Sequence, residues 1–170
     1  CTRESDCVDC GPRPFGCAGG ATGAVQMAEF EALSVDANGT STLLLDNATV
    51  SNVGGSNRAG KEIDQLVDGD LSTKWVDFNV APFVVDVGSP LSTSGISYRF
   101  ATANGAPERD PVQWTLEGSI DGERWFMIDD RSAAPQQDVP TARHAWTPFY
   151  RVGPQQSAAP TSPTTVTERD

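Results

Sequence analysis

Short apolar runs separated by glycine, proline or aspartate fill the chain between Asp64 and Asp129, and this pattern constrains the fold most. Within these runs large apolar residues recur at every second position, as in a strand with one buried face. This period of two predicts antiparallel strands, so we expect an all-β protein. The alternating apolar sets are Phe83, Val85 and Val87, then Ile96, Tyr98 and Phe100, then Trp114 and Leu116.

The earlier segment 25–35 is apolar enough for either a strand or a helix, because alanine, glutamate, methionine and leucine favour helices. We predict a strand, since the residues after it are strand-like and 36–39 read as a turn. Asp121-Gly122 predicts a tight hairpin turn with positive φ angles. Further strands are expected at 43–45, 48–53, 124–128 and 145–152, with a loop at 54–60.

A chain of 170 residues is long enough for one domain with a hydrophobic core and short for two. We expect a cysteine-rich segment at 1–23, one domain at 24–153 and a Pro/Thr-rich tail or linker at 154–170. A tail of this composition becomes ordered only when another surface holds it. Ordered ends would therefore indicate contact with other chains.

All four cysteines lie in the first 17 residues, at Cys1, Cys7, Cys10 and Cys17. Two disulfides in an oxidising compartment fit this cluster. A four-thiolate zinc or iron–sulfur site is the alternative, although only Cys7 and Cys10 have C-x-x-C ligand spacing, and free thiols are a third. Two N-x-T triplets, at Asn38 and Asn47, are compatible with export.

The chain begins with a cysteine and shows no signal peptide, so we expect a processed mature form or a fragment. We place it outside the cell or in an oxidising organellar lumen. Its net charge of −11 disfavours nucleic acid and anionic lipid as partners. No apolar run is long enough to cross a bilayer, so we expect a chain that does not span a membrane.

Residues suited to catalysis are scarce. The single histidine, His144, has no serine or cysteine nucleophile motif beside it, and the G-x-S-x-G, H-E-x-x-H and G-x-x-x-x-G-K patterns do not occur. Asp129 and Asp130 are adjacent on a predicted strand, so they point to opposite faces and cannot flank one glycosidic bond. We therefore expect binding or assembly and not an enzyme.

An acidic turn at Asp68-Gly69-Asp70, followed by Thr73, concentrates two carboxylates, a hydroxyl and several free carbonyls. Calcium prefers such oxygen ligands. The alternative is that Asp68 and Asp70 accept hydrogen bonds from the backbone of their own turn. Both interpretations stay open at the level of sequence.

Four segments resemble, in order, the discoidin family, which includes the C-type domains of coagulation factors and related carbohydrate-binding modules: DGDLSTKW, PFVVDVG, ISYRF and WTLEGSIDGERW. The resemblance covers about residues 25–152, and its wording is most similar to a branch from algae and other unicellular eukaryotes. It implies a galactose-binding-like jelly roll, an antiparallel β-sandwich.

In that family a structural calcium lies under the acidic turn and is also bound by a glutamate in an "AE" strand that closes the domain. The matching strand here contains Glu29 and lies at the front, so the resemblance implies a circularly shifted order. It also implies that the calcium ligands come from Glu29, Asp68, Asp70 and Thr73.

Family members bind their ligands through variable loops at one end of the sandwich. The candidates here are Asp77, Phe78, Asn79, Asn104, Glu108, Arg109 and Asp110. An aromatic ring with amide, carboxylate and guanidinium groups suits a sugar. As the alternative, Arg109 and Asp110 form an ion pair that fixes a long loop. Trp75, Trp114 and Trp125 are expected in the core.

The first predicted function is a module that binds glycans at an extracellular site or a cell surface. The second is a structural or adaptor subunit of a larger complex, for example on the lumenal side of a photosynthetic membrane. Lipid-headgroup binding is disfavoured, because it needs basic loop tips and this chain is acidic.

Overall fold

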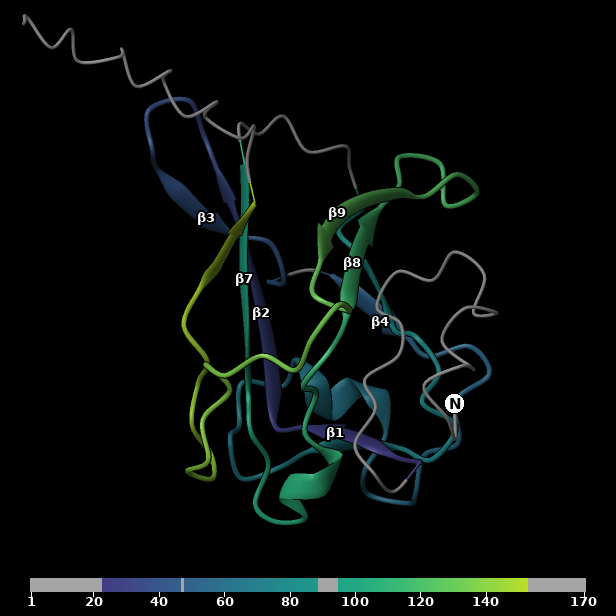
Figure 1. Cartoon of the computed structure of the whole chain (residues 1–170). Helices are drawn as coiled ribbons and strands as arrows, with labels where there is room; N and C mark the ends of the chain where they lie inside the picture. Colours follow the sequence, from purple (N-terminus) through teal and green to yellow (C-terminus); the bar gives the residue numbers. More distant parts are fainter. Residues whose placement is uncertain (1–22, 47, 89–94, 153–170) are drawn as a thin grey trace, which may run out of the picture.

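The structure is a computed structural model that describes residues 23–46, 48–88 and 95–152. The four cysteines and the C-terminal tail lie outside these ranges. The described chain is built almost entirely of antiparallel strands, so the predicted all-β class is confirmed (Figure 1). Its helical parts are two short 3-10 turns, η2 (Ile63–Leu66) and η3 (Pro107–Arg109).

Ten strands form one four-stranded and three two-stranded sheets within the described ranges. The larger sheet has the order β10-β7-β2-β3, and the pairs are β1-β5, β4-β6 and β8-β9. The bounds are β1 Val25–Met27, β2 Glu29–Val35, β3 Ser41–Leu43, β4 Thr49–Ser51, β5 Trp75–Asp77, β6 Val84–Asp86, β7 Gly95–Ala101, β8 Thr115–Gly118, β9 Phe126–Asp130 and β10 Tyr150–Val152.

The segment 25–35 is extended, as predicted, but it is divided at Ala28. β1 pairs with β5, whereas β2 pairs along its whole length with β7, from Glu29 opposite Ala101 to Val35 opposite Gly95. The Ala28 amide donates to the Ala101 carbonyl (2.9 Å) at the change of partner. Strand pairing therefore overrides the helix propensity of this segment.

Aromatic side chains make up most of the core. Tyr98 and Phe100 are completely buried in β7, as predicted, but Ile96 is only half-buried and Ser97 is buried, so burial follows the predicted alternation only in part. Phe30 packs edge-on against Phe83, and Phe100 packs edge-on against Trp114, each with ring centroids 5.2 Å apart. Trp75 and Trp114 are buried as expected, but Trp125 is only half-buried.

The connection between β8 and β9 differs from the predicted tight hairpin. Seven residues, 119–125, separate the strands, and β9 begins at Phe126 and not at Arg124. Only Gly122 of the expected turn pair has a positive φ (71°). The Asp121 carboxylate instead accepts the amides of Glu123 and Arg124 (2.9 and 2.8 Å), which stabilises a wider turn.

The last predicted strand is shorter than expected. Pairing with β7 begins only at Tyr150. Before it, Trp146 forms an isolated β-bridge with Ala101. The rings of Trp146 and Phe149 each lie 4.3 Å from the Arg99 guanidinium. No helix in the described part of the chain is both long and apolar enough to span a membrane.

Candidate functional site

The acidic turn is held together by its own side chains. The Asp68 carboxylate accepts the Asp70 amide (2.9 Å) and the Thr73 hydroxyl (2.9 Å). The Asp70 carboxylate accepts the Ser72 amide (2.8 Å). The capping interactions anticipated from the sequence are therefore present.

Glu29 reaches this turn from the start of β2. Its carboxylate accepts the Asp70 amide (3.1 Å), and the residue is only 4% exposed. Burial, together with the hydrogen bond and negative charge of Asp68, raises the pKa of Glu29 to about 8. Near neutral pH the Glu29 carboxyl therefore retains its proton and can donate a hydrogen bond to Asp68.

Three of the four predicted calcium ligands thus lie together: Glu29, Asp68 and Thr73. The Asp70 carboxylate instead accepts the Ser72 amide, and only the backbone amide of Asp70 contacts Glu29. Among the described residues no group of three or more His, Cys, Asp or Glu side chains is arranged to hold a metal. Carbonyl and hydroxyl oxygens would have to complete a calcium shell here.

Asp77, a predicted ligand-binding residue, is completely buried at the end of β5. Its carboxylate accepts the amides of Ser56 (2.6 Å), Asn79 (3.0 Å) and Ala81 (2.7 Å). The Asn52 side chain adds a longer contact (3.4 Å). Asp77 therefore positions the loop that follows it and presents no free oxygen to a ligand.

Phe78 lies next to Asp77 and is 44% exposed. The Arg109 guanidinium stands 5.6 Å from the centre of its ring, so the structure brings together two of the predicted ligand-binding residues. The Asn79 side chain donates to the Gly54 carbonyl (2.8 Å). Asn104 is exposed in the loop that leads to η3.

The predicted ion pair between Arg109 and Asp110 does not form. Asp110 is buried and pairs through both oxygens with Arg143, with one N–O distance of 2.7 Å. Arg143 also donates to the Ala103 carbonyl (2.6 Å). A bidentate partner from a distant loop therefore displaces the sequence neighbour, and Arg109 is left facing Phe78.

Gln26, in β1, is a site residue that the sequence analysis missed. Its buried amide donates to the carbonyls of Gly105 and Ala106, the latter at 2.9 Å, and accepts from the Lys74 ammonium (3.0 Å). Gln26 thus joins the loop before η3 to the residue before β5. The sequence held one signal for this role, since Gln26 is a polar residue between Val25 and Met27 in an otherwise apolar strand.

Backbone strain also concentrates at this end of the molecule. Within the described ranges, the non-glycine residues with positive φ are Val80 (51°), Ala106 (53°) and His144 (54°). They flank Phe78, Arg109 and Arg143 respectively. Left-handed conformations are unfavourable for such residues and persist only where surrounding contacts enforce them. The loops are therefore held in one defined arrangement.

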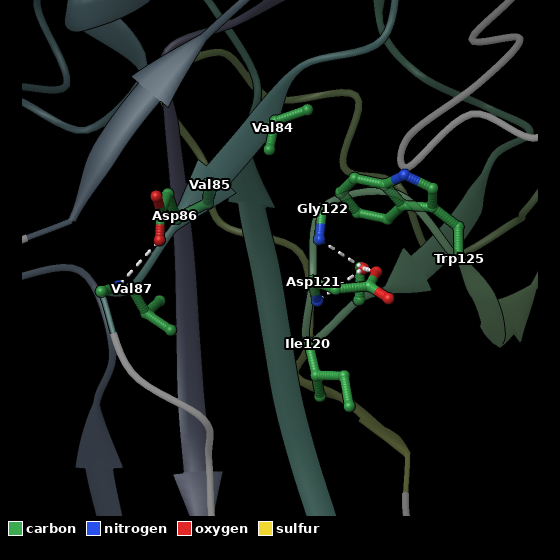
Figure 2. Close-up of a pocket in the computed structure, with 10 residues that line it drawn as sticks. Val84, Val85, Asp86, Val87, Ile120, Asp121, Gly122 and Trp125 are labelled. Atoms are coloured by element: carbon green, nitrogen blue, oxygen red, sulfur yellow. Dashed lines mark hydrogen bonds between the residues drawn. The ribbon is translucent and has the colours of Figure 1, made fainter.

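A groove of about 520 Å³ lies elsewhere, between β6 and the 119–125 turn. Figure 2 shows the Trp125 indole on one side and Val84 on the other, with Ile120 at the rim. The Asp121 carboxylate is occupied by its own turn, and Asp86 accepts the Gly88 amide (2.8 Å). Its lining mixes apolar side chains with polar atoms, and its two carboxylates already accept backbone amides.

Comparison with known proteins gives one partial match. The chain is 39% identical over 70 residues to a peptide-N(4)-(N-acetyl-beta-glucosaminyl)asparagine amidase of Arabidopsis thaliana. The similar region is 39% of this chain and 10% of the amidase. The chain matches no protein-family model and no solved structure.

Proposed function

We propose that this chain is a non-catalytic glycan-binding module with a discoidin-type, galactose-binding-like jelly roll. The proposal rests mainly on one observation, the half-exposed ring of Phe78 beneath the Arg109 guanidinium. An aromatic face packs against the C–H groups of a sugar ring, and a guanidinium donates to pairs of sugar oxygens. The binding site is therefore the loop end formed by 77–79 and 104–110.

The fixed geometry of these loops supports the same function. Asp77 holds the chain on both sides of Phe78, and Gln26 holds the loop that leads to Arg109. A preformed site loses little conformational entropy when a ligand binds. The partly similar plant protein is named as an amidase for asparagine that carries N-acetylglucosamine, which also favours a glycan.

We further propose a structural calcium at the acidic turn. Burial and the neighbouring Asp68 carboxylate favour the protonated form of Glu29. A calcium ion between the two carboxylates would supply a positive charge in place of that proton. The Thr73 hydroxyl and carbonyls of the turn would complete the shell. The ion would have no chemical role and would fix the turn that precedes β5.

A glycan array probed with the purified protein, with calcium and with EDTA, tests this function. For the best binder, Phe78→Ala is expected to weaken the affinity at least tenfold by isothermal titration calorimetry. Phe126→Ala is the matched control, since Phe126 is 65% exposed on the β8–β9 hairpin. Equal losses for both variants, or an array without binders, would overturn the proposal.

The adaptor function has one observation in its favour. The β8–β9 hairpin exposes Ile120 (85%), Phe126 (65%) and Met127 (55%) beside the apolar groove. Exposed apolar side chains that cluster in this way often mark protein contacts. If Ile120→Ser with Phe126→Ser abolishes co-purification of a native partner while glycan binding is absent, the adaptor function is the correct one.

A further inference from the structure

The loop end collects positive charge on a chain whose net charge is strongly negative. Lys74 directly precedes β5, and the carbonyl of Lys61 accepts the amide of Val76 within that strand (3.1 Å). Arg109 approaches from η3. Burial lowers the pKa of Lys74, and repulsion from Lys61, Arg109 and Arg143 lowers it further. The cations are thus close enough to repel one another.

Three of these cations have no carboxylate partner in the described part of the chain. The ion pairs found there involve Arg99, Arg124, Arg131 and Arg143, so Lys61, Lys74 and Arg109 are not among them. The Arg109 Nε atom is buried without a hydrogen-bond partner.

Acids on the same loops attract these cations but form no direct ion pair with Lys61, Lys74 or Arg109 in the described part of the chain. The Glu62 carboxylate accepts the Gly60 amide (3.0 Å), and Glu108 is exposed on η3 without an ion pair to Arg109. Asp110 is committed to Arg143. The neighbouring acids therefore leave Lys61, Lys74 and Arg109 without a direct carboxylate partner in the described residues. Cations in this state can bind an anionic ligand.

We propose that the glycan recognised at this end is anionic and carries a carboxylate or sulfate group that is bound by Arg109 and Lys74 beside the Phe78 ring. This inference rests on the proposed glycan-binding function and narrows its ligand. Phe78 contacts the apolar face of the sugar, Arg109 provides two parallel donors, and Lys74 provides a second charge. Lys61 adds attraction at longer range.

The net charge of −11 makes the local cations indispensable, because the rest of the molecule repels an anion. Salt screens both this long-range repulsion and the local attraction, so binding of an anion should depend on the salt concentration. A neutral sugar that uses only Phe78 should be almost insensitive to salt. Salt dependence thus separates an anionic from a neutral ligand.

The test compares trigalacturonate with its neutral methyl ester and with a sulfated galactotriose, by calorimetry in 50 and 500 mM sodium chloride. We expect one of the two anionic sugars to bind at least tenfold more tightly than the ester at low salt. This difference should change at least threefold between low and high salt, whereas the affinity for the ester should stay nearly constant. Whichever anionic sugar binds better identifies the charged group as carboxylate or sulfate.

Variants assign the charge to the site. Lys74→Gln is expected to weaken anionic binding about tenfold and to change binding of the ester less than twofold. Arg109→Gln is expected to weaken binding of both sugars, and binding of the anionic sugar at least threefold more than binding of the ester. Lys74→Arg should retain binding, and Arg151→Gln, an exposed cation on β10, is the matched control. Thermal melts establish that each variant is folded.

The outcomes separate the two proposals. If the ester binds as well as both acids and Phe78→Ala abolishes this binding, the glycan-binding function stands and the anionic ligand is wrong. If the array yields only neutral binders, the anionic ligand is also wrong. If no sugar on the array binds, both proposals are overturned.

Discussion

At the scale of single residues, Asp77 illustrates how one buried carboxylate can determine a loop. It accepts three backbone amides, from Ser56, Asn79 and Ala81, and so helps to join the loop that contains Ser56 to the loop that follows β5. We expect Asp77→Ala to lower the free energy of unfolding by about 3 kcal/mol, because three amides lose a charged acceptor. Urea denaturation measures this loss. Asp86→Ala, which frees one exposed amide, should cost under about 1 kcal/mol.

Ala106 has a left-handed backbone (φ 53°) in the loop that Gln26 holds. Glycine adopts this conformation without the Cβ clash, so Ala106→Gly should raise the free energy of unfolding by about 0.5 kcal/mol. Ala134→Gly, at an exposed position with ordinary φ, should lower it by about 0.5 kcal/mol. Equal losses for both variants, by chemical denaturation, would show that Ala106 is not strained.

At the scale of elements, a hydrogen-bonded chain of side chains connects β7 to the β8–β9 pair. The Trp114 indole donates to the Tyr98 hydroxyl (2.7 Å), and this hydroxyl donates to Asp129 (2.6 Å). Tyr98→Phe should lower the free energy of unfolding by about 2 kcal/mol, because it removes both bonds in a buried setting. In Tyr150→Phe, one bond to the exposed Asp138 is lost, and the cost should be under about 1 kcal/mol. Tryptophan-fluorescence denaturation curves compare the two.

Local alternation was sufficient to predict β6, β7 and β8, because a half-buried strand places apolar residues at every second position, but it gave no signal for β5. It could not predict the break at Ala28, since that break depends on which distant strand pairs with each half. The β8–β9 connection was mispredicted for a related reason. Asp121-Gly122 suits a tight turn, but side-chain hydrogen bonds from Asp121 stabilise a longer one.

At the scale of the whole molecule, protons and calcium should compete at the acidic turn. The pKa of Glu29 is about 8 in the folded state and 4.5 ordinarily, so the folded protein binds the extra proton. In EDTA the stability from this group is therefore fully present below pH 4.5 and is lost as the pH rises through 8. Glu29→Gln should flatten this slope in urea titrations between pH 5 and 9. Calcium should stabilise the wild-type protein most at the alkaline end.

The candidate site was predictable only in part. Phe78 and Arg109 were identifiable because an aromatic and a guanidinium in variable loops suit sugar binding, and the structure brings them together. The pairing of Asp110 with Arg143, 33 residues apart, and the role of Gln26 depend on tertiary contacts that no local pattern encodes. The cysteines and both tails lie outside the described residues, so their disulfides and partner contacts remain predictions.

The division of one extended segment at Ala28 has a mechanical consequence. Gln26, before the break, holds the loop that leads to η3, which we propose binds a sugar, and Glu29, after it, holds the acidic turn. The adjacent residues Thr73 and Lys74 make a second connection, because Thr73 donates to Asp68 in the acidic turn and Lys74 donates to Gln26. Cation and saccharide should therefore act as heterotropic effectors, each increasing the affinity of the other by an equal factor. Titrating either ligand in the presence and absence of the other would reveal that reciprocity.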